Sequence, residues 1–372
     1  ILYGRYHRHE DDDRNRRLVP FDFSGIYDEF PSLKRLNVDI DVLTMDPVID
    51  SSNVTPANWA ALAELIRDNY TRYDGFVVLH GTDTMSYTAS ALSFMLENLA
   101  KPVVFTGSQI PIGVLRTDGR ENLITAIEIA GAHIGGRPEV PEVSLYFQNR
   151  LFRANRTTKR SAEALSAFRS YNYPPLAEVG VNIAYNLAAI LHPTEISPEL
   201  RIATRLADGI EVIKLFPGLG ENILRAMLSA PGLRAVVLET FGAGNAPTNE
   251  WFIRVLKEAI DRGVIILNIT QCGGGKVSMK LYETGLRAAE DRRPVRPRHD
   301  HRGGRHEADV RARTGAFRRT GPRIAAAPPA RRIYSLRRCT ERFFFLYFAL
   351  LMDPFRAPSG ETDGPAAGQI TG

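Results

Sequence analysis

The sequence predicts an α/β protein with two domains. The larger N-terminal domain is expected to have a mostly parallel sheet with helices on both faces, and the smaller C-terminal domain is also α/β. Short β-branched apolar runs alternate with longer stretches whose apolar residues recur every three or four positions. This alternation occurs twice within the 372 residues. Residues 186–205, which have little periodicity and contain Pro193 and Pro198, are interpreted as the linker between the two domains.

The N-terminal domain is expected over residues 1–185. A helix there is predicted to begin at Pro56, because proline suits the first position of a helix. The expected elements are a strand Val38–Met45, a helix Pro56–Tyr70, a strand Phe76–Leu79, a helix Met85–Leu99, a strand Lys101–Thr106, a helix Asp118–Ala132 and a strand Val143–Phe147. Strands that alternate with helices predict parallel pairing.

The C-terminal domain is expected over residues 206–285. Its predicted elements are a strand Ile210–Leu215, a helix Asn222–Ser229, a strand Ala235–Glu239, a helix Asn249–Arg262 and a strand Val264–Thr270. After Gly285 the composition changes to Arg, Pro, Gly, Ala and His, and no Lys follows Lys280. Residues 286–372 are therefore predicted to be a disordered tail.

The basic charge is concentrated in that tail. The net charge is +5 and the pI about 9.2, but Leu286–Arg342 alone holds 17 Arg against 6 acidic residues. The remaining body is acidic, so we expect no nucleic-acid partner. No apolar run reaches about 18 residues and the first residues lack an apolar signal segment, so neither membrane insertion nor secretion is expected. Two cysteines, Cys272 and Cys339, make no disulfide framework, and a cytoplasmic location is predicted.

Thr82 and Asp83 lie where the predicted strand Phe76–Leu79 ends and the next helix begins. Ligands of open α/β sheets bind at this carboxyl edge. An ordinary turn in which Thr82 or Asp83 caps the helix explains the same position equally well. The surrounding string HGTDTM resembles the second active-site motif of bacterial-type L-asparaginases, and the neighbouring residues resemble their cytosolic, type I branch. The strings DGFVVLHGTDTMSYTASALSFMLENL, FTGSQIPI, LRTDGRENL, NRTTK and GNAP extend the resemblance over about Leu18–Gly285.

The resemblance implies hydrolysis of L-asparagine to L-aspartate and ammonia without a cofactor, in a homodimer or homotetramer. A threonine hydroxyl becomes a nucleophile only when a base removes its proton, and an unprotonated lysine can do so. By resemblance the catalytic residues are Thr82, Asp83 and Lys159, and the substrate-binding residues are Asp50, Ser51, Ser52, Thr82 and Asp83. Taken without this context, Lys159 is a surface lysine and Asp50–Asn53 a loop or helix cap. Thr106–Gln109 is also expected to line the pocket.

Two tracts depart from the family. Its first motif, Thr-Gly-Gly-Thr-Ile-Gly, carries the nucleophile, whereas the sequence has Tyr-Gly-Arg-Tyr-His-Arg-His at Tyr3–His9. Codons TAC GGG CGG TAC CAT CGG CAT, read one base later, encode the family motif. Codons for Arg296–Val310, also read one base later, can encode a sequence similar to the last helix of the family. We therefore interpret about residues 3–17 and residues 286–372 as the product of translation in a shifted reading frame. A genuine Arg-rich tail is the rival interpretation of the second segment.

Other functions are weighed against this one. A catalytically dead protein that binds asparagine or aspartate would explain a missing nucleophile, and the asparaginase-like subunit of a transfer-RNA amidotransferase shares the domain. No metal cluster and no P-loop is expected from the sequence. Thr270 and Cys272 match a regulatory asparagine site of some relatives, but Glu239 replaces an expected arginine, so no allostery is predicted.

Overall fold

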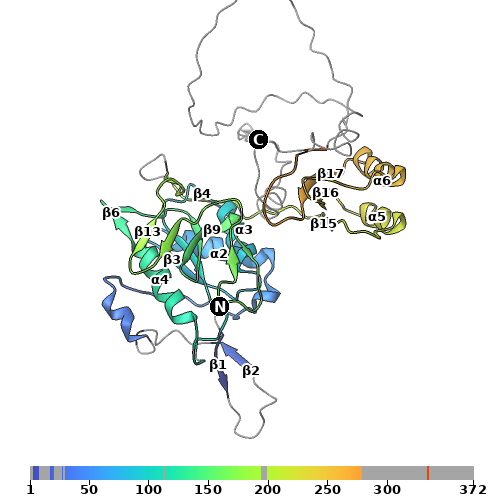
Figure 1. Cartoon of the computed structure of the whole chain (residues 1–372). Coiled ribbons are helices and arrows are strands. Elements are labelled where there is room, and N and C mark those ends of the chain that lie inside the picture. The colour runs from blue at the N-terminus through green and yellow to red at the C-terminus, as the bar shows by residue number, and fades with distance from the viewer. Residues whose placement is uncertain are drawn as a thin grey trace, which may run out of the picture. The chain divides into compact units, whose positions relative to one another are not determined.

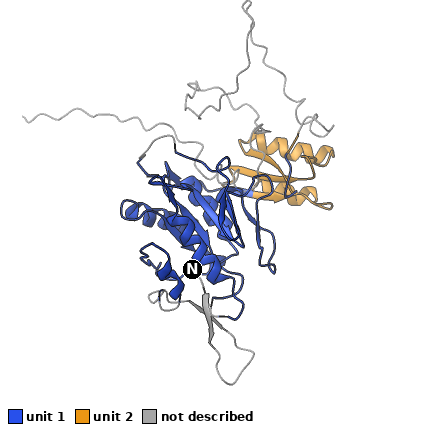
Figure 2. Ribbon diagram, turned by 60° about the vertical axis from the view of Figure 1, so that its left-hand side comes forward, with its two compact units in different colours: residues 1–211, 272–276, 336–372 blue, residues 212–271, 277–335 orange. Residues whose placement is uncertain are grey.

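The computed structural model describes residues 3–7, 17–20, 27, 30–112, 114–193, 199–278 and 333–334. The chain forms two compact units, shown in Figure 2. The first comprises residues 1–211, 272–276 and 336–372, and the second comprises residues 212–271 and 277–335. The change of unit after Glu211 follows the linker predicted over residues 186–205.

A six-stranded mixed sheet in the order β13-β12-β9-β8-β5-β3 forms the centre of the first unit (Figure 1). Three strands are parallel, as predicted: β3 (Phe76–Leu79), β5 (Val103–Thr106) and β8 (Val143–Phe147). Three further strands extend the sheet by antiparallel pairing: β9 (Arg150–Arg153), β12 (Ala177–Val179) and β13 (Ile183–Tyr185). The predicted two-domain α/β class is confirmed, and the antiparallel extension is an addition to it.

The β8–β9 hairpin shows why the extension was not predicted. Its two turn residues, Gln148 and Asn149, both have positive φ angles, 45° and 65°. Such a two-residue turn is usually marked by Asn-Gly or Asp-Gly, and Gln-Asn does not give that signal. The hairpin must therefore be stabilised by its strands, whose side chains Leu145 and Phe152 are opposite each other and buried.

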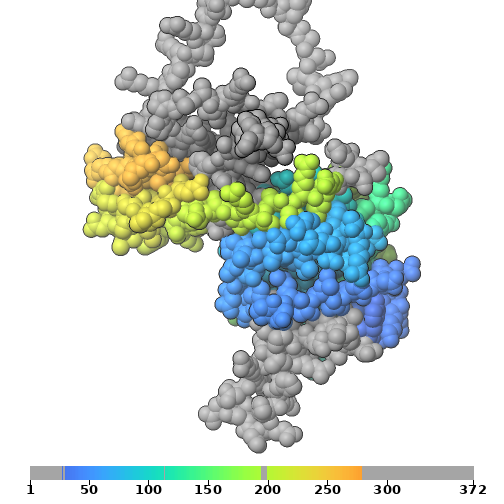
Figure 3. Space-filling view, turned by 180° about the vertical axis from the view of Figure 1, so that it is seen from behind, coloured from blue at the N-terminus to red at the C-terminus, as the bar shows by residue number. Residues whose placement is uncertain are grey.

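Helices cover both faces of the sheet, as predicted. The structure places them at α2 (Pro56–Asn69), α3 (Met85–Met95) and α4 (Gly119–Gly131). Val103 and Phe105 of β5 share a buried cluster with α2 and α3, whereas Val104 between them shares another with α4. The three consecutive apolar residues of β5, Val103 to Phe105, are therefore explained by two buried faces. The blue surface in Figure 3 includes α2.

Two predicted elements differ in the structure. Val38–Met45 is not a strand. The alternate side chains Val38 and Ile40 instead pack beside α4, which explains the alternation of apolar and polar residues that predicted a strand. The helix predicted over Met85–Leu99 ends at Met95, and the next two residues form the short strand β4 (Leu96–Glu97). This strand pairs with β14 (Arg201–Ile202), so part of the predicted linker belongs to the first unit.

Short elements complete the first unit. They are β1 (Tyr3–His7), β2 (Arg17–Pro20), η1 (Pro31–Arg35), η2 (Ser51–Asn53), β6 (His133–Ile134), β7 (Arg137–Pro138), η3 (Ala154–Arg156), β10 (Thr158–Lys159) and β11 (Phe168–Arg169). β1 pairs with β2, β6 with β7 and β10 with β11, all antiparallel. The pairing of β10 with β11 matters most for function, because it holds Lys159.

The second unit has a four-stranded sheet in the order β15-β16-β17-β18. Its elements are β15 (Ile210–Lys214), α5 (Glu221–Leu228), β16 (Ala235–Thr240), α6 (Glu250–Asp261), β17 (Ile265–Thr270) and β18 (Ile333–Tyr334). All five predicted elements are present, with ends shifted by a few residues at most. Leu224 and Leu228 of α5 meet Phe252 and Val255 of α6 in one buried cluster, and Figure 1 shows the two helices side by side.

The tail is described only at Ile333–Tyr334. This dipeptide pairs parallel with Ile266 and Leu267 of β17. An open strand edge offers free N–H and C=O groups that any extended segment can use. The rest of the predicted tail lies outside the described residues.

Candidate active site

The predicted site residues Thr82 and Asp83 lie in the turn between β3 and α3, as the sequence indicated. β5 ends beside this turn. The approach is so close that a Cβ atom added to Gly107 would lie 2.3 Å from the carbonyl oxygen of His80. Glycine is therefore required here by space, and the ends of two parallel strands place their loops against each other.

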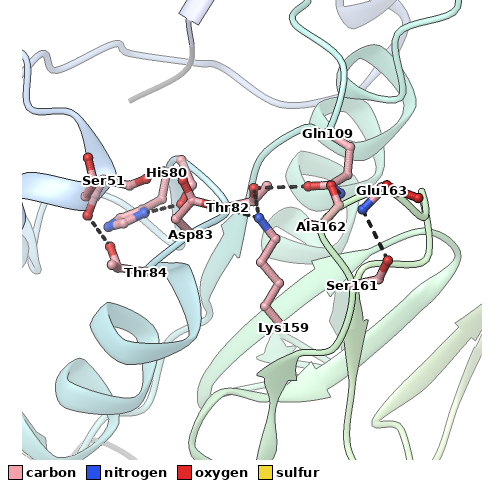
Figure 4. A network of polar contacts seen from close by, with 12 residues as sticks. Ser51, His80, Thr82, Asp83, Thr84, Gln109, Lys159, Ser161, Ala162 and Glu163 are labelled. Atoms are coloured by element: carbon pink, nitrogen blue, oxygen red, sulfur yellow. Dashed lines mark hydrogen bonds and ion pairs between the residues drawn. The ribbon is translucent and has the colours of Figure 1, made fainter.

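Lys159 reaches this turn from β10, 77 residues further along the chain. Its Nζ donates to Thr82 Oγ1 at 2.8 Å and lies 2.7 Å from Asp83 Oδ1 (Figure 4). The Lys159 side chain is 18% exposed, whereas that of Asp83 is 68% exposed. The structure thus brings together the three residues predicted to be catalytic, and the carboxylate of Asp83 remains open to solvent.

Gln109 contacts the same hydroxyl from the loop after β5. Its Nε2 donates to the carbonyl oxygens of Ala162 at 3.0 Å and Ala164 at 3.3 Å, which directs Oε1 toward Thr82. Thr82 Oγ1 donates to this oxygen at 3.0 Å. The backbone N–H of Gln109 is held in turn by the carboxylate of Asp118, the residue that precedes α4. Thr82 Oγ1 therefore has a defined donor and a defined acceptor.

His80, immediately before the turn, is a residue to which the sequence reasoning assigned no role. It is 6% exposed, and burial lowers its pKa to about 4, although a hydrogen bond to Gly81 opposes the shift. Nδ1 must carry the proton, because it lies 2.7 Å from the Gly81 carbonyl oxygen, which only accepts. Nε2 then accepts from Thr88, whose oxygen also accepts from Trp59 Nε1. This buried chain links α2 and α3 to the turn.

The loop predicted to bind the substrate's α-carboxylate lies beside the same turn. Ser51 is 6% exposed, and its Oγ would lie 2.5 Å from a Cβ atom added to Gly81. Asp50 accepts from the backbone N–H and the hydroxyl of Ser52 through Oδ1. One oxygen of Asp50 therefore organises the loop itself, as the alternative interpretation of a capped turn requires.

Within the first unit, Thr106 is not part of this cluster, because it is buried and its Oγ1 donates to the backbone carbonyl oxygen of Tyr146. Thr270 and Glu239 belong to the second unit, and Cys272 is an exposed cysteine. In the described part of the chain, no three or more His, Cys, Asp or Glu residues form a metal site, and no helix is long and apolar enough to cross a membrane.

Comparisons with known proteins agree with the residues at the site. The family "Asparaginase, N-terminal" matches residues 9–191, and "Glutaminase/Asparaginase C-terminal domain" matches residues 209–294. L-asparaginase 1 of Escherichia coli K12 is 46% identical over 248 residues, which cover 66% of this chain and 71% of that protein. The mouse 60 kDa lysophospholipase is 44% identical over 67% of this chain, but only 43% of its own length is matched.

A solved structure shows the same architecture. L-asparaginase I from Vibrio cholerae superimposes with a TM-score of 0.66 at 41% sequence identity, covering 78% of this chain and 84% of that one. The site motifs, the two-unit α/β fold and both family matches lead to one conclusion: this chain belongs to the asparaginase family.

Proposed function

We propose that this protein hydrolyses the side-chain amide of L-asparagine to L-aspartate and ammonia, with no cofactor. The observation that carries the proposal is the position of Lys159 Nζ, within hydrogen-bond distance of both Thr82 Oγ1 and Asp83 Oδ1. A hydroxyl beside an amine and a carboxylate is suited to proton transfer during acyl transfer. The names of the E. coli and Vibrio relatives support this substrate.

Each residue is given a role that its surroundings support. Thr82 and Lys159 transfer protons between the reacting oxygen and the leaving nitrogen. Asp83 binds the α-ammonium group of the substrate, for which its exposed carboxylate is available. Ser51 and Ser52, with Asp50, form the loop that holds the α-carboxylate. A cytoplasmic location and a homodimer or homotetramer complete the proposal, and sedimentation analysis of the purified protein tests the assembly.

The nucleophile is assigned to the first family motif, which the shifted reading of Tyr3–His9 restores. The proposal includes this shift: about residues 3–17, and the tail from about residue 286, are out-of-frame text. The printed chain is then expected to release little ammonia, because loss of a covalent nucleophile leaves only binding and electrostatic effects. Sequencing of the locus tests the shift, and an unbroken frame that encodes the printed text would contradict it.

The experiment is an ammonia-release assay with L-asparagine on the printed chain and on a chain with both ends returned to frame. The proposal expects turnover at about 1–10³ per second only in the second chain. The alternative, a dead homologue that binds asparagine or aspartate, predicts binding without turnover in both chains. Turnover typical of enzymes in the printed chain would show that the missing motif is not required.

A further inference from the structure

Thr84 ends the Thr82–Thr84 turn and is the N-cap residue of α3. A threonine at this position usually accepts a hydrogen bond from a backbone N–H of the first helical turn. Thr84 makes no such capping bond; instead its Oγ1 donates to the carbonyl oxygen of Ser51 at 2.5 Å, 33 residues earlier in the chain (Figure 4). The hydroxyl therefore joins two loops rather than stabilising its own helix.

A second contact holds the same two loops together. Gly81 lies so close to Ser51 that an added Cβ atom would be 2.5 Å from Ser51 Oγ and 2.7 Å from Ser51 Cβ. Ser51 is 6% exposed, so its position is fixed by packing as well as by the bond from Thr84. The loop around Ser51 and the turn with Thr82 and Asp83 are thus joined by one hydrogen bond and one tight packing contact, which we call the junction.

We propose that Thr84 is a positioning residue that sets the distance between the two groups that bind the substrate's α-amino acid head. The inference rests on the proposed function, in which Asp83 binds the ammonium and the Ser51 loop binds the carboxylate. These two groups are attached to one carbon atom of the ligand, so their binding sites must keep a fixed short separation. A junction that is already formed spares the ligand the entropy of ordering the loop.

The test is calorimetric titration of the full printed chain with L-aspartate, which requires binding but no turnover. Thr84→Val keeps the shape of the side chain and removes the donor, so we expect affinity to fall about fivefold, the value of one ordinary hydrogen bond. Thr84→Ser keeps the hydroxyl and should bind within about twofold of the wild type. Ser93→Ala is the matched control: it removes a hydroxyl bond to a backbone carbonyl, that of Ser90, on the same helix.

A second variant keeps the inference testable if Thr84→Val does not fold. Gly81→Ala leaves the hydroxyl in place and forces the junction apart, and it should also weaken L-aspartate binding. In the chain with restored ends, Thr84→Val should raise KM and leave kcat within about twofold, whereas general destabilisation would lower both thermal stability and kcat. If the wild type, Thr84→Val and Gly81→Ala bind L-aspartate with equal affinity, the positioning role of Thr84 is wrong, whereas the proposed function is unaffected. Absence of L-aspartate binding to the wild type overturns the proposed binding site as well.

Discussion

At the scale of single residues, the central feature is the environment of Thr82 Oγ1. The oxygen lies between a donor, Lys159 Nζ, and an acceptor, Gln109 Oε1. The two carbonyl groups that bind the Gln109 amide fix its orientation, so the direction of the Thr82 hydroxyl follows from hydrogen-bond chemistry. The fixed donor and acceptor hold Thr82 Oγ1 in one position within hydrogen-bond distance of Lys159, as the proposed proton-transfer role requires.

Replacement of Lys159 tests that role. In the chain with restored ends, Lys159→Met should lower the rate of ammonia release at least about 10²-fold, since general acid–base groups contribute that much. Lys257→Met, at an exposed position on α6, is the control and should retain the wild-type rate. A wild-type rate in Lys159→Met would remove Lys159 from the reaction.

His80 predicts how stability depends on pH. In the unfolded chain its pKa is near 6.5, whereas burial lowers it to about 4 in the folded protein. As the pH falls below 6.5 the unfolded state therefore binds a proton that the folded state binds only near pH 4, and the free energy of unfolding decreases. The expected loss is roughly 3 kcal/mol between pH 7 and pH 4.

Urea unfolding at several pH values measures this loss. In His80→Gln the part of the pH dependence that comes from this histidine should disappear, whereas His133→Gln, which replaces an exposed histidine, should retain it. An identical pH profile for His80→Gln and the wild type would show that His80 is not the group responsible.

At the scale of elements, an ion pair holds the end of β9 to the residue before β8. Arg153 binds Glu142 at 2.6 Å, both side chains are 9% exposed, and Arg153 Nη2 also donates to the carbonyl oxygen of Ala189. Glu142 accepts from the backbone N–H of Leu191 as well. The pair thus joins the hairpin to the segment that follows β13.

Breaking this pair should be costly because it leaves a buried charge without its partner. Arg153→Met is expected to lower the free energy of unfolding by about 3–5 kcal/mol, and a further Glu142→Gln change should recover part of the loss. The control lies on the same strand: Arg150 meets Glu178 at 3.6 Å with both side chains largely exposed. Arg150→Met should cost less than about 1 kcal/mol. Equal effects of Arg150→Met and Arg153→Met in urea titrations would contradict this account.

At the scale of the whole molecule, the proposed frameshift of the tail bears on the stability of the second unit. The resemblance places a last helix of the family in the region that begins after Gly285, and the proposed frameshift would replace the sequence of that helix. We expect the unit around β16 and β17 to be less stable than the first unit, because loss of a packed helix is large against a total stability of roughly 5–15 kcal/mol.

Hydrogen exchange tests this expectation on both versions of the chain. In the printed chain, amides of β17 should exchange faster than those of β5, and returning the tail to frame should slow β17 without changing β5. Slow exchange throughout residues 286–316 of the printed chain, matching β5, would show that the tail is folded as written.

The sequence by itself determined the alternation of elements and the placement of Thr82 and Asp83 between β3 and α3, because both depend on local periodicity and on residues adjacent in the chain. It also indicated the family, through motifs that remain readable without coordinates. Only the tertiary structure decided which segments meet: Lys159 with Thr82 across 77 residues, and Thr84 with Ser51 across 33. It also decided that Val38–Met45 packs without forming a strand. The physical reason is that an alternation of apolar and polar residues shows which side chains are buried, but not whether the segment pairs as a strand. Which side chains form hydrogen bonds across the chain depends on the loops that the packed sheet brings to one edge.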